Sequence, residues 1–205
     1  MARVVDRDAK RLQLVEAAAA CFANSGYDAT SMNDVAAAAG VSKGTLYDYF
    51  DGKEDLFYAV FEWLQQQLMQ TALSGLAAED SRTEQVVSAV EAAVAGWVRH
   101  VSLYPVSLEV WAAAARTGTR QRFAHAMQTL YTTYRSELVR LLRAAQEGGE
   151  VKTGVDIEGI AATLVGAIDG LLLQFWLDQS FDIQRIVRTF MSALFEGIAT
   201  ARGKA

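Results

Sequence analysis

The sequence has little proline, cysteine or histidine. Its 205 residues include one proline, one cysteine and two histidines. Cys21 has no partner for an internal disulfide, and two histidines with one cysteine cannot assemble the usual zinc ligand sets. The scarcity of proline, beside the alanine runs at 17–20, 36–39 and 112–115, is typical of an all-helical protein. We therefore expect an all-α fold without a metal centre or a cofactor.

Long apolar runs and an excess of basic charge are also missing. No stretch approaches about 18 uninterrupted apolar residues, and the N-terminus has no signal-peptide core, which predicts a cytoplasmic protein without a membrane partner. The net charge is −5, with six basic and seven acidic residues before residue 54 and 13 basic and 17 acidic residues after it. This balance excludes a protein that coats DNA by bulk charge, but it leaves a small DNA-binding domain possible.

Apolar residues recur at helical spacing through most of the chain. The pattern predicts a first helix over residues 8–24, ended by Asn24-Ser25-Gly26, and two short helices that begin after Ser31 and Ser42. Six longer helices are expected at 53–74, 82–102, 106–115, 119–146, 156–178 and 182–200. We expect a small N-terminal domain over residues 1–53 and a helical bundle over residues 54–205.

The two short helices have the spacing of a helix-turn-helix. Ser31 can cap the first helix with Asp34 three residues later, and Gly40 lies where that helix must stop. Leu46 and Phe50, four residues apart, form the inner face of the second helix. A tight turn with glycine between two capped helices is typical of DNA-binding hairpins, although alanine-rich helical hairpins without DNA also have it.

The outer face of the second short helix strengthens the prediction of DNA binding. Its exposed residues are Lys43, Gly44, Thr45, Tyr47, Asp48 and Tyr49. Hydroxyl and ammonium groups are suitable phosphate donors, and the free N–H groups at a helix start attract phosphate. Asp48 either accepts a hydrogen bond from a cytosine amino group or points to water.

The run of residues 26–56 resembles the DNA-binding domain of the tetracycline-repressor (TetR) family. The resemblance implies a homodimeric transcriptional regulator, usually a repressor, whose C-terminal bundle binds a small molecule and dimerises through its last two helices. It implies DNA contacts at the matching positions, which are Ser31, Asn33, Ser42, Lys43, Gly44, Thr45, Tyr47, Tyr49 and Lys53. A two-fold dimer would require a pseudo-palindromic operator of double-stranded DNA.

Basic residues also lie at the N-terminus, before and at the start of the first helix, at Arg3, Arg7, Lys10 and Arg11. They form either an arm that reaches DNA or a solvated terminus, since Asp6 and Asp8 lie among them.

The C-terminal bundle has two candidate sites. The aromatic and soft side chains of a pocket for an apolar or aromatic effector are Trp63, Trp97, His100, Trp111, Phe123, Met127, Tyr131, Phe175 and Trp176. The apolar stripes of the last two helices predict a dimer interface that contains Leu164, Ile168, Leu171, Phe175, Val187, Phe190 and Leu194. A helix at 53–74, shared by both domains, would carry the effect of ligand to the DNA-binding helices.

Other functions fit the sequence less well. Neither histidine has a glutamate three positions before it, and no dinucleotide or phosphate-loop pattern is present, so an enzyme is not expected. The alternative is a helical protein-interaction module, or an activator without a small-molecule effector.

Overall fold

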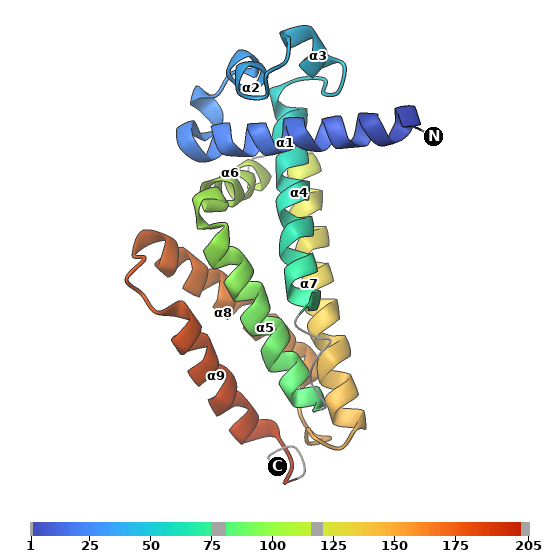
Figure 1. Cartoon of the computed structure of the whole chain (residues 1–205). Helices are drawn as coiled ribbons and strands as arrows, with labels where there is room; N and C mark the ends of the chain where they lie inside the picture. The colour runs from blue at the N-terminus through green and yellow to red at the C-terminus, as the bar shows by residue number, and fades with distance from the viewer. Residues whose placement is uncertain (1, 75–80, 116–120, 202–205) are drawn as a thin grey trace. The chain divides into compact units, whose positions relative to one another are not determined.

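The computed structural model describes residues 2–74, 81–115 and 121–201. Within these ranges the chain forms the helices α1 to α9 and the short 3-10 helix η2 (Figure 1). Their bounds are α1 Ala2–Ala29, α2 Met32–Ala38, α3 Lys43–Tyr47, α4 Lys53–Ser74, α5 Arg82–Arg99, η2 Val101–Leu103, α6 Tyr104–Ala114, α7 Gln121–Glu147, α8 Ile157–Leu177 and α9 Ile183–Ile198. The expected all-α fold is confirmed, and the expected start of the helix at 119–146 lies outside the described residues.

The first helix is longer than the sequence pattern predicts. α1 begins at Ala2 rather than at Asp8, because no helix-breaking residue precedes Asp8. The basic residues of the expected arm are therefore part of a helix. Helical geometry is interrupted at Gly26, whose φ of +75° is a left-handed conformation that glycine adopts without strain. The chain bends at Gly26, as the sequence predicts.

The described chain divides into two compact units. The first contains Met1–Gln67 and His100–His125, and the second contains Leu68–Arg99 and Ala126–Ala205. This division follows packing, and α4 and α7 each continue from one unit into the other. The functional boundary after residue 53 stays a prediction.

An aromatic cluster holds the first unit together. The ring of Phe57 on α4 meets Phe22 edge-on at a centroid distance of 5.1 Å and Tyr27 at 4.7 Å. Phe22 and Phe57 are buried. Edge-to-face pairs of this kind add about 0.5–1.5 kcal/mol each to the burial of their rings. The cluster fixes the end of α1 against α4. In the chain, α2 and α3 lie between these two helices.

The second unit is a bundle of α5, α7, α8, α9 and the last part of α4. The start of α5 is held by Glu150, which accepts hydrogen bonds from the N–H of Thr83 at 2.9 Å and from the hydroxyl of Ser81 at 2.9 Å. Partial burial raises the pKa of Glu150, but the hydrogen bonds from Thr83, Ser81 and Arg82 outweigh it and leave the pKa lowered. The core includes Leu142, Leu164 and Met191, all fully buried.

Candidate DNA interface and ligand cavity

Two serine caps define the helix-turn-helix. Ser31 and Asp34 form a capping box at the start of α2, in which the Ser31 N–H donates to Asp34 Oδ2 at 2.8 Å and the Asp34 N–H donates to Ser31 Oγ at 3.3 Å. Hydrogen bonds from the side chain and backbone of Ser31 lower the pKa of Asp34. At the start of α3, Ser42 Oγ accepts from the N–H of Thr45 at 3.1 Å. Both caps were expected from the sequence.

The turn between α2 and α3 depends on Gly40. Its φ of +66° is left-handed, and the next N–H, of Val41, donates back to the carbonyl of Ala36 at 3.0 Å. The inner faces of both short helices are buried, through Val35 and Ala36 on α2 and through Leu46 and, just after α3, Phe50. Burial of these side chains orients α3 and leaves its other face to solvent (Figure 1).

The outer face of α3 carries the residue types that contact DNA. Lys43, Gly44 and Tyr47 are exposed, and Tyr47 keeps 47% of its surface in solvent. The Nζ of Lys43 lies 5.9 Å from the centroid of the Tyr47 ring. A Cβ added at Gly44 would meet only Ser42 Oγ, at 3.7 Å, so packing within the chain does not require glycine here. Glycine would be required at this position if another molecule approached the backbone of α3 closely.

The other residues implied by the resemblance lie around α3. Ser31, Asn33 and Ser42 are exposed, but the hydroxyls of Ser31 and Ser42 already serve as helix caps. Thr45 and Tyr49 are half-buried, and the hydroxyl of Thr45 lies 2.9 Å from that of Ser42. Tyr49 follows α3 rather than lying on it, because α3 ends at Tyr47.

Two arginines of α1 lie beside this surface. The guanidinium of Arg7 lies over the ring of Tyr49, 5.7 Å from its centroid, and that of Arg11 lies 5.3 Å from the centroid of Phe50. Both arginines are exposed. Arg7 and Arg11 are therefore held next to the end of α3 by a helix.

Lys53, at the start of α4, already has backbone partners. Its ammonium donates to the carbonyl of Tyr27 at 2.8 Å and to that of Asp28 at 3.3 Å, and it lies 4.3 Å from the centroid of the Tyr27 ring. A phosphate contact by Lys53 would compete with these interactions. The sequence pattern identified the position but not this structural role.

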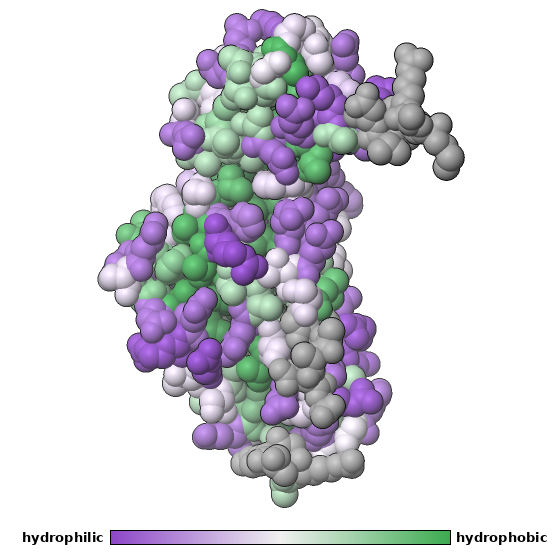
Figure 2. Space-filling model, viewed as in Figure 1, coloured by the Kyte–Doolittle hydropathy of each residue, from purple (hydrophilic) through white to green (hydrophobic). Residues whose placement is uncertain are grey.

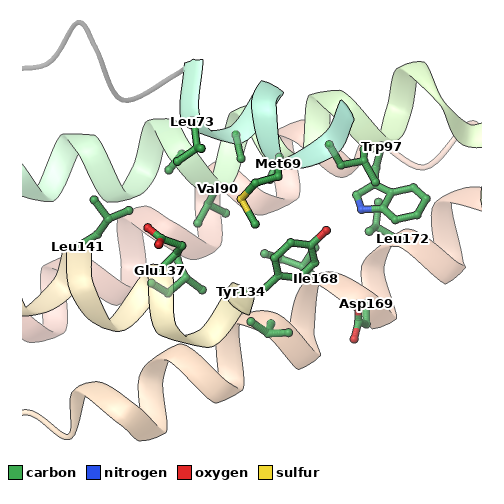
Figure 3. Close-up of a pocket in the computed structure, with 16 residues that line it drawn as sticks. Met69, Leu73, Val90, Trp97, Tyr134, Glu137, Leu141, Ile168, Asp169 and Leu172 are labelled. Atoms are coloured by element: carbon green, nitrogen blue, oxygen red, sulfur yellow. The ribbon is translucent and has the colours of Figure 1, made fainter. Parts of the chain in front are cut away.

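The second unit contains an apolar cavity of about 110 Å³. α4 lines it through Leu68, Met69, Ala72 and Leu73, and the rest of the lining comes from α5, α7 and α8 (Figure 3). In Figure 3, Trp97, Leu172 and Asp169 lie toward one end, Leu141, Leu73 and Glu137 toward the other, and Tyr134 between them. Concave, largely apolar sites with a few polar groups are typical of small-molecule binding.

Three residues of the cavity lining have ionisable side chains, namely Tyr134, Glu137 and Asp169. Asp169 Oδ2 accepts a hydrogen bond from the hydroxyl of Tyr131 at 2.8 Å. Burial raises the pKa of Asp169, and the bond from Tyr131 opposes this only in part. Burial, with the nearby charge of Asp169, also raises the pKa of Tyr134. Glu137 accepts from Arg140 Nε at 2.9 Å on the more exposed side of α7.

The structure distributes the residues of the expected ligand set over both units, and the set stays a prediction. Of its nine residues, Trp97 lines the cavity, and Tyr131 touches it indirectly through Asp169. Four of the others belong to the first unit, namely Trp63, His100, Trp111 and Phe123, and three lie in the second unit outside the cavity lining, namely Met127, Phe175 and Trp176. Aromatic side chains also fill cores, as Phe123 does beside Phe57 at 6.0 Å. The cavity-lining residues that the sequence analysis did not select are mainly aliphatic, and their helical spacing is the same as that of core residues.

The expected dimer stripe stays a prediction, and its residues differ in how far they are buried within the single chain. Leu164 and Val187 are buried within the chain, and Ile168 lines the cavity. Leu171, Phe175 and Leu194 are half-buried, and Phe190 is 39% exposed. On the outward faces of the two helices, exposed small or apolar residues lie among polar ones such as Arg185, Arg188 and Glu196; the small or apolar ones are Ala162, Gly166, Gly170, Leu173 and Leu177 on α8 and Phe190, Ala193 and Gly197 on α9.

These outward faces leave apolar surface in solvent. Figure 2 shows apolar side chains between hydrophilic ones over the region of α5, α8 and α9. Among the single described helices, α8 is long and apolar enough, by length and composition, to cross a membrane. In the structure, 28% of its most apolar window is buried within the chain. A groove of about 330 Å³ between α8 and α9 is lined by Ile160, Phe190 and Leu194, among others.

Comparisons with known proteins cover both units. Residues 14–60 match the model for bacterial regulatory proteins of the tetR family, and residues 82–198 match the C-terminal model of BetI-type transcriptional repressors. The fatty acid metabolism regulator protein of Bacillus subtilis is 23% identical over 193 residues, which are 92% of this chain and 95% of that protein. The transcriptional repressor KstR2 of Rhodococcus jostii is 24% identical over 200 residues, covering 95% and 93% of the two chains.

A solved structure gives the same fold. FadR of Bacillus subtilis in complex with stearoyl-CoA superimposes with a TM-score of 0.76 at 22% identity, over 91% of this chain and 98% of that one. The helix-turn-helix geometry, the helical second unit and the two family matches agree. The chain belongs to the tetR family of bacterial regulatory proteins, with a BetI-type C-terminal part, and it is a transcriptional regulator rather than an enzyme.

Proposed function

We propose that this regulator is a ligand-responsive repressor, which binds a pseudo-palindromic operator as a homodimer and is released by an apolar or aromatic small molecule. Such a protein works where the DNA is, in the cytoplasm. The observation that carries the proposal is the continuity of α4. This helix starts six residues after α3 ends and supplies Leu68, Met69, Ala72 and Leu73 to the cavity near its other end.

The proposed DNA contacts centre on α3. Lys43 and Tyr47 are exposed donors, and Gly44 permits close approach of the backbone to the duplex. Thr45, Tyr49 and Asn33 lie at the edge of the same surface, and Arg7 and Arg11 add positive charge to it. The few cations predict few phosphate contacts in each subunit and a modest dependence of affinity on salt.

The proposed dimer forms through the outward faces of α8 and α9. Small residues such as Ala162, Gly166 and Gly170 allow helices to approach closely, and a Cβ added at Gly166 or Gly170 would meet nothing in this chain. A partner would cover apolar surface that a single chain leaves in solvent. Two-fold symmetry would present two copies of α3 to half-sites about 34–36 Å apart.

The cavity is the proposed effector site. Its lining is mostly aliphatic, which favours an apolar molecule. The names of the relatives, a fatty acid metabolism regulator and a FadR bound to stearoyl-CoA, are consistent with an apolar effector. A ligand that fits the cavity in only one position of α4 would change the population of the DNA-binding conformation.

Reciprocal binding measurements test this proposal. An effector found by its stabilisation of the protein against heat should lower operator affinity about 5- to 150-fold, and operator should lower effector affinity by the same factor. Ala93→Phe, which adds a ring inside the cavity lining, should abolish both effects, whereas Ala124→Phe on the exposed face of α7 should not. Operator affinity that no cavity ligand changes would favour a regulator without a small-molecule effector, and the absence of operator affinity would favour an interaction module.

A further inference from the structure

The charge of the cavity lining has one sign. The two ionisable carboxylates in the described lining are Glu137 on α7 and Asp169 on α8, and the same lining includes no lysine, arginine or histidine. An anionic headgroup placed in this cavity would therefore find no counter-charge in its walls. Because charges interact more strongly where water is scarce, the sign of the lining selects the ligand.

The two carboxylates differ in how far they are neutralised. Glu137 is paired with Arg140 at 2.9 Å, and its side chain is 41% exposed. Asp169 is more enclosed, and in the described part of the chain its side chain makes one hydrogen bond, from Tyr131 to Oδ2, and no ion pair. A carboxylate accepts several hydrogen bonds, so Oδ1 keeps its capacity for a ligand. Asp169 is thus the uncompensated charge of the cavity.

Two aromatic rings also line the cavity, one at the end where Asp169 lies and one between the two ends. Trp97 on α5 and Tyr134 on α7 line the same cavity, and Figure 3 places Trp97 and Asp169 toward the same end. Aromatic faces attract cations, most strongly tryptophan, and organic ammonium groups are bound by such rings together with carboxylates. Aliphatic residues such as Met69, Leu138 and Ile168 line the rest of the cavity and suit a hydrocarbon body.

We propose that the cavity binds lipophilic cations, in which an amine or quaternary ammonium group sits near Asp169, Trp97 and Tyr134 and an apolar body lies against the aliphatic lining. This inference names the ligand class of the effector site and rests on the proposed function only for its effect on DNA binding. It separates this chain from the neighbour solved with stearoyl-CoA, whose ligand carries several negative charges.

Three probes with similar hydrocarbon chains test the inference on the whole protein. Octyltrimethylammonium, octanol and octanoate carry a cationic, a neutral and an anionic headgroup, and isothermal titration calorimetry gives the affinity of each. We expect octyltrimethylammonium to bind about tenfold or more tightly than octanoate, the scale of one charge-assisted interaction. Asp169→Asn should lower the affinity for the cation about tenfold and leave that for octanol unchanged.

The variants and probes distinguish a loss of cation binding from a loss of folding. Asparagine keeps an oxygen that can accept the hydrogen bond from Tyr131, and retained octanol binding shows that the cavity is intact. Glu147→Gln, an exposed residue on α7, removes the same charge elsewhere and should change nothing. Equal or tighter binding of octanoate, or a cation affinity that Asp169→Asn leaves unchanged, would overturn the inference.

The outcome for DNA separates this inference from the proposed function. Cation binding that requires Asp169 but leaves operator affinity unchanged would support the ligand class and contradict regulation through the cavity. Release of operator by octanoate alone, unaffected by Asp169→Asn, would support regulation and contradict the ligand class.

Discussion

The ammonium of Lys53 lies 4.3 Å from the centroid of the Tyr27 ring and donates a hydrogen bond to the carbonyl of Tyr27 at 2.8 Å. This pair joins the start of α4 to the end of α1, and the segment between them is the helix-turn-helix. Lys53, which the sequence analysis predicts to contact phosphate, therefore also holds together the two helices that flank the helix-turn-helix.

Replacement of Lys53 separates these two roles. Lys53→Met keeps the aliphatic stem and removes the cation, so we expect the free energy of unfolding to fall by about 1–3 kcal/mol, since the hydrogen bond to the part-buried carbonyl of Tyr27 and a cation–π contact are lost. Urea denaturation without DNA measures this change. Lys10→Met on α1, whose ammonium donates to Gln13 Oε1 at 2.9 Å in the described part of the chain, is the matched control. Unchanged stability in Lys53→Met would leave only the phosphate role.

The exposed donors of α3 should affect DNA binding without affecting folding. We expect Lys43→Ala and Tyr47→Ala each to weaken operator binding by about 1–3 kcal/mol, because both side chains are exposed and pack on little else. Thermal unfolding should stay as in the original protein. Arg135→Ala, an exposed arginine on α7, controls for the loss of a positive charge. Operator affinity that survives both substitutions would place DNA recognition elsewhere.

The outward face of α9 should control assembly. Phe190→Glu places a charge on a side chain that is 39% exposed, so the folded chain can tolerate it, but a partner covering this face cannot. We expect a shift from dimer to monomer in sedimentation experiments, and a loss of operator affinity with it. Gln184→Glu, exposed on the same helix nearer its start, should leave the dimer intact. A Phe190→Glu protein that stays dimeric would contradict this interface.

The charge of Asp169 predicts a pH dependence of cation binding. Burial raises the pKa of Asp169, partly opposed by Tyr131, and the other titratable groups that line the cavity are Tyr134 and Glu137 on α7. Octyltrimethylammonium has no titrating proton, so its affinity should be highest above the raised pKa of Asp169 and should fall as the pH drops through it. Calorimetric titrations at several pH values measure this, and the Asp169→Asn protein should lack the dependence.

The same shift has a consequence for stability without ligand. The pKa of Asp169 is higher in the folded than in the unfolded protein, so its contribution to stability is fully present below the unfolded pKa and is lost as the pH rises through the folded pKa. Asp169→Asn should therefore raise the free energy of unfolding at neutral pH, and the gain should vanish in acid. An equal effect at all pH values would show that packing, rather than charge, is responsible.

The sequence predicts the helix-turn-helix well because its signals are local. Ser31 and Ser42 cap helices within three residues, and Gly40 adopts the left-handed conformation that its place after a helix requires. The start of α1 is less predictable, because helix formers continue before the capping residue Asp8 and nothing local stops the helix there.

The cavity and the outward faces could not be predicted residue by residue. Hydrophobic spacing shows which side of a helix avoids water, but it does not show whether that side meets core, cavity or partner. Leu164 and Ile168 lie one turn apart on α8, yet Leu164 is fully buried and Ile168 lines the cavity. Whether such a residue is buried or lines a cavity depends on the volumes of the side chains that other helices place against it. Only the folded chain brings those helices together.

Selection of bound sequences from random double-stranded DNA by the purified full-length protein tests the central claim most directly. The account predicts enrichment of a pseudo-palindrome with half-sites about one helical turn apart, bound by two subunits. It also predicts that enrichment is lost in the Lys43→Ala, Tyr47→Ala double variant while the fold and the dimer persist. Absence of any enriched sequence, or equal enrichment by the double variant, would contradict it.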